Sequence, residues 1–217
     1  MKLILQIIPV FLIVSQGYCV NILYMHDVFS PSHHIWNNAL ARGLAARGYN
    51  VTFLSTDPPK SNTQNLHYIV IENGYELLNK FLGENHENYD IVKYSQEVNK
   101  NKFAAATFLA EYAVKSCEAI AASSHGLDII LDYPNDFKFD LVINDFTAGP
   151  CFLPLIQKFN YPSVIGVSAF LNPTYTDFVI GGHKHPAYVP HFLLNFPQIM
   201  SFYQRAYNFA IYITEKL

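Results

Sequence analysis

The chain is predicted to fold as an α/β domain with a parallel, Rossmann-like sheet, because short apolar runs alternate with helical patterns along its length. Its 217 residues are 51% hydrophobic and 14% charged, a composition typical of a globular protein with one substantial core. A net charge of −3 gives no reason to expect nucleic acid as a partner. No internal repeat and no clear domain boundary interrupt the pattern after residue 19, so residues 20–217 are predicted to form a single domain.

The first segment, Met1–Cys19, has the features of a secretory signal peptide. Lys2 gives it a positive start, and an apolar run follows from Leu3 to Val14. This run is short for a membrane span, so its removal is expected rather than anchoring. The mature chain would then begin near Val20, inside the secretory pathway.

Two cysteines remain after that segment, Cys117 and Cys151. An oxidising compartment permits a disulfide between them, and two buried free thiols are an equal alternative. Asn50 begins the single glycosylation sequon, but it leads directly into a predicted strand, which argues against modification.

The predicted elements alternate in a regular order. Strands are expected at 20–24, 51–55, 66–71, 139–144 and 163–167. Helices are expected at 31–47, 103–122, 151–159 and beyond about 196, with part of 75–89 also helical. In the common doubly wound order 3-2-1-4-5, the first and fourth strands are neighbours, and ligands bind beyond their carboxyl ends.

The helix after the first strand begins with a histidine pair. Ser30 suits the N-cap and Pro31 suits the first helical position, which places His33 and His34 in the first turn. Histidine is the side chain most often used as a general base, so His33 is a candidate for that role. The alternative is that both histidines are polar residues that face water.

Two helices are expected to be amphipathic. On the helix at 31–47, an apolar stripe of Trp36, Leu40 and Leu44, with Ala39 and Gly43 beside it, is predicted to face the sheet. On the last helix, the apolar side is predicted to contain Ile199, Phe202, Tyr203, Ala206, Phe209 and Ile213.

The fourth predicted strand ends at Asp145, and this places a carboxylate beside the first strand's end. His33 and Asp145 would then meet at the same crevice of the sheet. A carboxylate that accepts a hydrogen bond from one imidazole nitrogen fixes the tautomer and stabilises the imidazolium that forms when the other nitrogen takes a proton. The alternative is that Asp145 only caps the following helix.

Several other chemistries are not supported. The chain has no G-x-G-x-x-G after the first strand, no P-loop and no G-x-S-x-G elbow, so it lacks the usual phosphate cradle and serine nucleophile. His183, His185 and His191 do not match a zinc-ligand spacing, and a solvated loop is the preferred interpretation. No metal site is therefore predicted.

Five features, taken in order, resemble the amino-terminal half of the UDP-glycosyltransferases, the UDP-glucuronosyl- and glucosyltransferase family. They are Ser32-His33, Arg47-Gly48-Tyr49-Asn50-Val51-Thr52, Phe139-Asp140-Leu141-Val142-Ile143-Asn144-Asp145, Tyr188-Val189-Pro190 and Phe202-Tyr203-Gln204-Arg205. Tyr49 stands where the family usually has histidine. The form Pro31-Ser32-His33-His34-Ile35-Trp36 is similar to the insect branch.

This resemblance implies the GT-B fold, in which two Rossmann-like domains face each other and the amino-terminal one binds the acceptor. It implies that His33 deprotonates an acceptor hydroxyl, that Asp145 orients His33, and that transfer inverts the anomeric centre without a metal or any cofactor besides the UDP-sugar co-substrate. His33 is preferred to His34 because only the Ser-His placement keeps the fourteen-residue spacing to the Arg-Gly motif. The implied acceptor-binding residues are Ser32, Trp36, Phe146 and Phe170, with a core position as the alternative for Trp36.

The resemblance also implies a donor domain and a transmembrane helix beyond Leu217. The 217 residues alone are therefore expected not to transfer a sugar. The expected substrates are a small lipophilic acceptor and UDP-glucose or UDP-glucuronate. Contact with a membrane is expected only through the absent helix, and the same resemblance allows an oligomer with other family members. The implied setting is detoxification in the endoplasmic reticulum lumen. The alternative function is a lumenal or secreted short form that binds lipophilic molecules, or regulates full-length enzymes, without catalysis.

Overall fold

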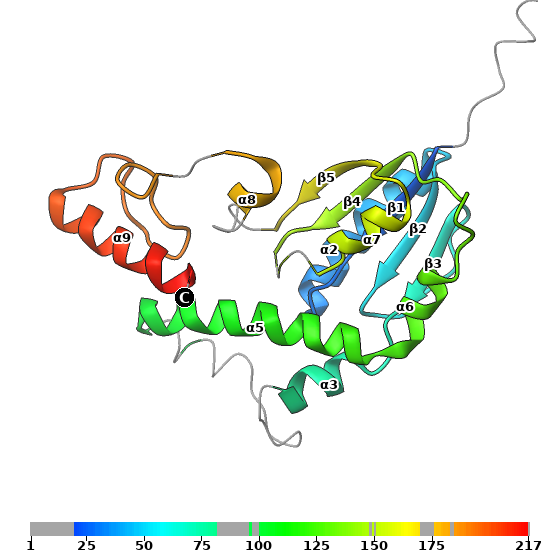
Figure 1. Ribbon diagram of the computed structural model, residues 1–217, viewed down its shortest axis with the longest axis horizontal. Helices are drawn as coiled ribbons and strands as arrows, with labels where there is room; N and C mark the ends of the chain where they lie inside the picture. The colour runs from blue at the N-terminus through cyan, green and yellow to red at the C-terminus, as the bar shows by residue number, and fades with distance from the viewer. Residues whose placement is uncertain are drawn as a thin grey trace, which may run out of the picture.

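The structure is a computed structural model and describes residues 20–81, 96, 100–147, 149, 151–169, 176–182 and 185–216. These residues contain a five-stranded, all-parallel sheet in the order β3-β2-β1-β4-β5, with helices on both faces (Figure 1). The predicted α/β class and strand order are therefore confirmed. The predicted signal peptide lies outside the described residues. Within the described part of the chain, no helix has both the length and the apolar character needed to cross a bilayer.

The strands are β1 (Asn21–Met25), β2 (Asn50–Ser55), β3 (Leu66–Val70), β4 (Leu141–Asp145) and β5 (Ser163–Val167). The helices are α2 (Pro31–Ala46), α3 (Gly74–Phe81), α5 (Lys102–Ala122), α6 (Ser124–Leu131), α7 (Leu153–Lys158), α8 (Thr176–Ile180) and α9 (Phe202–Lys216).

Strand β1 lies at the centre of the sheet and fixes the place of the candidate site. Ile22 is in register with Val51 of β2 on one side and with Leu141 of β4 on the other. All three strands run in the same direction, so their carboxyl ends meet at one edge of the sheet. The segments that leave β1 and β4 there begin at His26 and Phe146.

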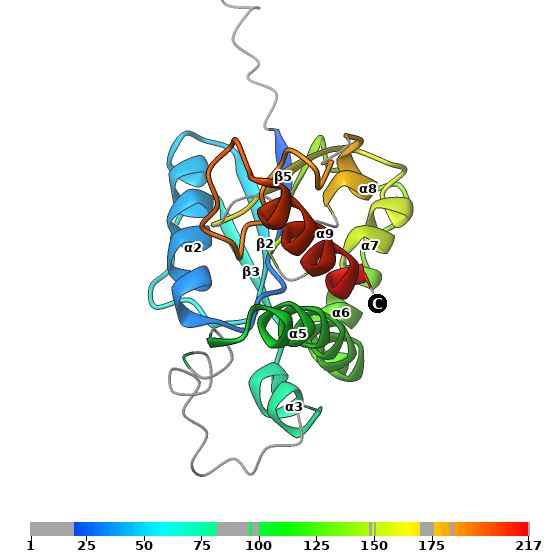
Figure 2. The same ribbon diagram turned by 90° about the vertical axis from the view of Figure 1, so that its left-hand side faces the viewer.

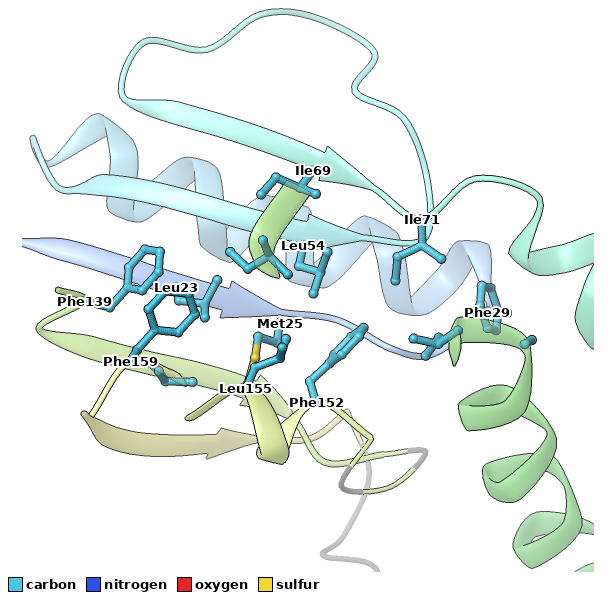
Figure 3. Close-up of a cluster of buried hydrophobic side chains, with 14 of the residues drawn as sticks. Leu23, Met25, Phe29, Leu54, Ile69, Ile71, Phe139, Phe152, Leu155 and Phe159 are labelled. Carbon is cyan, nitrogen blue, oxygen red and sulfur yellow. The ribbon is translucent and has the colours of Figure 1, made fainter. Parts of the chain in front are cut away.

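Helices α6 and α7 cover one face of the sheet, and α5 crosses below the strand ends with α3 packed against it (Figure 1). Side chains from these helices and from the strands form the larger hydrophobic cluster (Figure 3). The labelled members are Leu23, Met25, Phe29, Leu54, Ile69, Ile71, Phe139, Phe152, Leu155 and Phe159. Each large apolar side chain that is fully buried stabilises the fold by about 1.5–3 kcal/mol, so this layer holds the parallel strands in register.

The other face is covered by α2, and the predicted apolar stripe on this helix is wrong. The buried positions of α2 are His33, His34, Asn37, Ala41 and Ala45, whereas Leu40 is 38% exposed. The two alanines let the helix approach the sheet closely. The polar residues at the start of the helix are buried because they bond to groups at the ends of the strands, and this rotates the predicted stripe away from the sheet.

The last helix, α9, packs against α5 rather than against the sheet (Figure 2). Its buried residues are Asn208, Ile211 and Tyr212. The side predicted to be apolar is instead exposed to solvent, with Ile199 just before the helix 90% exposed and Phe202 70% exposed. The prediction of an amphipathic helix did not identify the face that is buried in this chain.

A disulfide joins Cys117 of α5 to Cys151, which lies just before α7, with a Cα–Cα distance of 5.3 Å. Of the two alternatives open from the sequence, the structure has the bridged form. Asn50, the sequon residue, donates from its side-chain amide to the Asn21 Oδ1 at 2.7 Å, so that nitrogen already has a partner within the sheet.

Helix α6 was missed by the sequence prediction, which expected no helix between residues 122 and 151. The backbone turns at Gly126, which has a φ of +92°, and a Cβ on it would lie 2.5 Å from the Val70 carbonyl oxygen. Only glycine fits that close approach with a positive φ. The chain then resumes a helix to Leu131, which buries Ile130 in the larger cluster.

Candidate functional site

The candidate site lies where β1 and β4 end. His33 comes from the first turn of α2, and Asp145 is the last residue of β4. The His33 Nδ1 lies 3.5 Å from the Asp145 Oδ2, and both side chains are buried. The structure therefore brings together the two residues that the sequence placed at one crevice.

Asp145 is fully buried, and its carboxylate is surrounded by donors. Its Oδ1 accepts from the Thr147 backbone N–H at 2.9 Å and from the Thr147 hydroxyl at 2.6 Å, and its Oδ2 accepts from the Asn37 amide at 2.6 Å. Burial alone would raise the pKa of Asp145, but hydrogen bonds from His26, His33, Thr147 and Asn37 outweigh it and hold that pKa well below its usual range. The carboxylate is thus kept ionised inside the protein.

Asn37, which was not predicted as a site residue, bonds both to the Asp145 carboxylate and to the backbone of His33. Its amide nitrogen also donates to the His33 carbonyl at 3.0 Å, and its Oδ1 accepts from the Tyr24 hydroxyl at 2.7 Å. Burial, with a smaller effect from the Asp145 charge, raises the pKa of Tyr24 well above its usual value, so the phenol stays a hydrogen-bond donor. The signal in the sequence is the polar residue four positions after His33, on the same helical face.

His26 and Asp27 follow β1 directly and were also missed. The His26 Nδ1 lies 3.5 Å from the same Asp145 Oδ2 that faces His33. Neither Asp27 carboxyl oxygen has a hydrogen-bond partner among the described residues. Burial first and the Asp145 charge second raise the pKa of Asp27 well above its usual value. The Asp27 and Cys151 backbone N–H groups, which lie near the carboxyl without reaching hydrogen-bond geometry, have a weaker opposite effect. The site therefore places an ionised carboxylate near a second carboxyl group whose pKa is raised.

His34, the neighbour of His33, faces a different part of the site. Its Nδ1 lies 3.1 Å from the Ser55 Oγ and 3.8 Å from the Asp57 Oδ2. Burial lowers the pKa of His34, and the Asp57 carboxylate acts in the opposite direction. Each of the residues His26, His34 and Asp57 offers one ligand atom, and these three atoms lie within 4.8 Å of one another. The three residues are therefore a group able to hold a metal ion.

The four predicted acceptor-binding residues have different environments. Ser32 is exposed, and its Oγ lies 3.0 Å from the Ser30 Oγ. Ser30 occupies the N-cap position of α2, but its side chain makes no capping hydrogen bond. The Trp36 ring centroid lies 6.5 Å from that of His33, and its buried Nε1 has no hydrogen-bond partner among the described residues. Phe146 is buried against Gly166. Phe170 lies outside the described residues.

The histidines of the 183–191 segment do not form a cluster within the described part of the chain, and His183 lies outside it. His185 is exposed and stacks on Tyr188. His191 is buried rather than solvated, because its Nε2 pairs with the Glu215 carboxylate on α9 and its backbone N–H donates to the Asn208 Oδ1. The prediction of a solvated loop is therefore wrong for His191.

A parallel sheet in this order defines a Rossmann-like α/β domain, and the candidate site, with its polar side chains at the ends of the first and fourth strands, lies at the topological switch point. The chain is 28% identical over 209 residues to UDP-glucosyltransferase 2 of the insect Dactylopius coccus, covering 95% of this chain and 37% of the relative. It is also 28% identical over 207 residues to UDP-glycosyltransferase UGT4 of the same organism, covering 95% and 38%. No family model and no solved structure matches it.

The chain is thus similar over nearly its whole length to insect UDP-glycosyltransferases, which confirms the resemblance drawn from its motifs. It spans less than two fifths of the length of these two relatives.

Proposed function

We propose that the chain is the acceptor-binding, proton-abstracting half of an inverting UDP-glycosyltransferase with the GT-B architecture. In this reaction His33 takes the proton from an acceptor hydroxyl as its oxygen attacks the anomeric carbon of the sugar. One carbon–oxygen bond forms, the bond from that carbon to the UDP phosphate breaks, and UDP leaves with the electron pair. The observation that carries the proposal is the contact between the His33 Nδ1 and the Asp145 Oδ2 at the switch point.

The role proposed for Asp145 follows from its state. A carboxylate kept ionised beside Nδ1 favours the tautomer with the proton on Nδ1, which leaves Nε2 to act as the base. The same negative charge stabilises the imidazolium once the proton has moved. The 3.5 Å separation is at the long end for a hydrogen bond, as is common for catalytic pairs without substrate.

The UDP-sugar, glucose or glucuronate, is proposed to bind mainly on a partner domain, since the chain lacks the glycine-rich phosphate signatures. A small lipophilic acceptor fits the aromatic neighbours of His33, of which Trp36 is the nearest in sequence. The endoplasmic reticulum lumen is the proposed location, and the Cys117–Cys151 disulfide supports an oxidising compartment.

Two measurements test this function. Trp36 is the single tryptophan of the chain, so its fluorescence reports directly on acceptor binding beside His33. Phenolic acceptors are expected to change this emission with a saturable dependence on concentration. Transfer is measured with labelled UDP-glucose and UDP-glucuronate, both on the 217-residue chain and on a fusion of the chain to the donor-binding portion of UDP-glucosyltransferase 2. The chain alone is expected to be inactive, and the fusion active.

The variant His33→Gln in the fusion should lower the transfer rate by 10²-fold or more and leave the fluorescence titration unchanged. His34→Gln is the matched control, because His34 is equally buried but faces Ser55 instead of Asp145. Equal transfer by His33→Gln and wild type would show that the base is assigned wrongly. Saturable binding without transfer by any fusion would favour the alternative of a binding or regulatory protein, and transfer by the 217-residue chain would contradict the proposed division of the site.

A further inference from the structure

We propose that His26, His34 and Asp57 form a site for a divalent cation of the zinc type, which does not include the proposed base His33 but adjoins it through Asp145. The three residues come from three segments that meet at the carboxyl ends of β1 and β2. Their ligand atoms lie within 4.8 Å of one another, and both histidines are buried. Two imidazoles and one carboxylate form a donor set that zinc and other first-row divalent ions use in proteins.

The second, independent observation is the bare Nε2 of His26. His26 is fully buried, and this nitrogen has no hydrogen-bond partner among the described residues. Buried polar atoms nearly always have a partner, so an atom without one points to a missing ligand.

The protonation of His26 follows from the bonds around its other nitrogen. The Asn37 amide has two N–H groups, and its two shortest bonds go to the Asp145 Oδ2 at 2.6 Å and to the His33 carbonyl at 3.0 Å. Neither N–H group of Asn37 is left to donate to the His26 Nδ1, which lies 3.2 Å away. We therefore assign the proton of His26 to Nδ1, which faces the Asp145 carboxylate. The Nε2 then presents a lone pair.

This arrangement is the one that histidine ligands of metals usually have. A ligating imidazole commonly donates its other N–H to a carboxylate, which fixes the ring and raises the basicity of the coordinating nitrogen. Asp145 supplies that carboxylate to His26. It is already held in place by Thr147 and Asn37, so the first ligand is oriented before any ion binds.

Asp57 completes the site from the solvent side. Its Oδ2 lies 3.8 Å from the His34 Nδ1 and is positioned by the Thr56 hydroxyl at 2.8 Å and the Tyr75 hydroxyl at 2.9 Å. Asp57 is half-buried, which gives an ion a way in from solvent. Tetrahedral zinc with bonds of about 2.0–2.2 Å needs ligand atoms about 3.3–3.6 Å apart, so these side chains must close by about 1 Å on binding. The nearby positive charge of Lys60 opposes the cation, whereas Asp57 and Asp145 favour it.

The test uses the 217-residue chain and the bare metal as probe. The chain is stripped with a chelator, titrated with Zn²⁺ against a chromophoric competitor, and its thermal unfolding is followed with and without Zn²⁺. Titration with Co²⁺ gives a visible absorption band if the ion is bound in a four-coordinate nitrogen and oxygen site. We expect one equivalent of Zn²⁺, a midpoint of unfolding raised by several degrees, and a visible Co²⁺ band.

The variants His34→Gln and Asp57→Asn should each lower zinc affinity at least tenfold and remove the Co²⁺ band. His67→Gln is the control, because His67 is exposed on β3 and is not part of the cluster. The proposal would be overturned if the folded wild-type chain did not bind Zn²⁺. It would also be overturned if binding were unchanged in both variants, or were lost only in His67→Gln. The readouts do not involve sugar transfer, so this site and the proposed base can fail independently.

Discussion

Replacing Asp145 with asparagine tests the ionised carboxylate on which the site depends. Asparagine keeps the size of the side chain and one acceptor oxygen, but it puts an amide where Asn37 now donates at 2.6 Å. A hydrogen bond to a charged group contributes about 1.5–3 kcal/mol, and a buried donor left without an acceptor costs about 1–3 kcal/mol. With the charge also lost to His33 and His26, we expect Asp145→Asn to lower the free energy of unfolding by about 3 kcal/mol. For a chain of this size that corresponds to a fall of roughly 6–12 °C in Tm.

The pH dependence of the loss separates the charge from simple packing. The pKa of Asp145 is lower in the folded than in the unfolded protein, so its stabilisation is fully present above the unfolded value of about 3.9 and is lost as pH falls through the folded value. The difference in Tm between wild type and Asp145→Asn should therefore be constant from pH 6 to 8 and shrink below about pH 4. Asp132→Asn, at an exposed helix end, is the control and should change stability by less than about 0.5 kcal/mol. A difference that is absent at pH 7, or that stays the same at pH 3, would refute the reasoning.

Three further perturbations have defined outcomes. Because the pKa of Asp27 is raised in the folded protein, its charge opposes folding increasingly as pH rises above about 4. In thermal unfolding, the stability of Asp27→Asn relative to wild type should therefore increase with pH, and a decrease would contradict this. Reducing the Cys117–Cys151 bridge, with its separation of 34 residues, should cost about 4 kcal/mol in urea unfolding, and no change in midpoint would refute the estimate. Gly166→Ala would bring a Cβ within 2.1 Å of the Phe146 ring and should destabilise the chain by about 1–3 kcal/mol, whereas an unchanged Tm would show that the ring moves freely.

Much of the fold could be predicted from sequence because it depends on periodicity. The short apolar runs and the glycine stop at Arg47-Gly48 determine where strands and helices lie, and the crossover rule for parallel strands restricts their order. Those constraints also placed His33 and Asp145 at one edge of the sheet, since His33 lies in the first turn of the helix after β1 and Asp145 ends β4. The helix after Gly126 was missed because the turn at this glycine depends on the Val70 carbonyl, which is distant in sequence.

The rest of the site depends on three-dimensional contacts that no local pattern contains. Asn37 and His26 are buried because they bond to Asp145, more than 100 residues away in the chain. The same bonds override the apolar stripe expected on α2 and leave Leu40 exposed. A hydropathy pattern assigns polar residues to the solvent side of a helix, so it fails where polar residues are buried to build a site.

The long helix α5 gives the chain a further property. One part of it is bonded through Cys117 to Cys151, six positions after Asp145, and another part packs through Ala106 against Ile211 of α9. The segment that follows Asp145 and the last helix are therefore both attached to α5. A molecule that displaces α9 would have to break this packing or move α5, to which Cys151 is bonded. Helix α5 is thus a continuous physical link between α9 and the segment that leaves the edge where His33 and Asp145 meet.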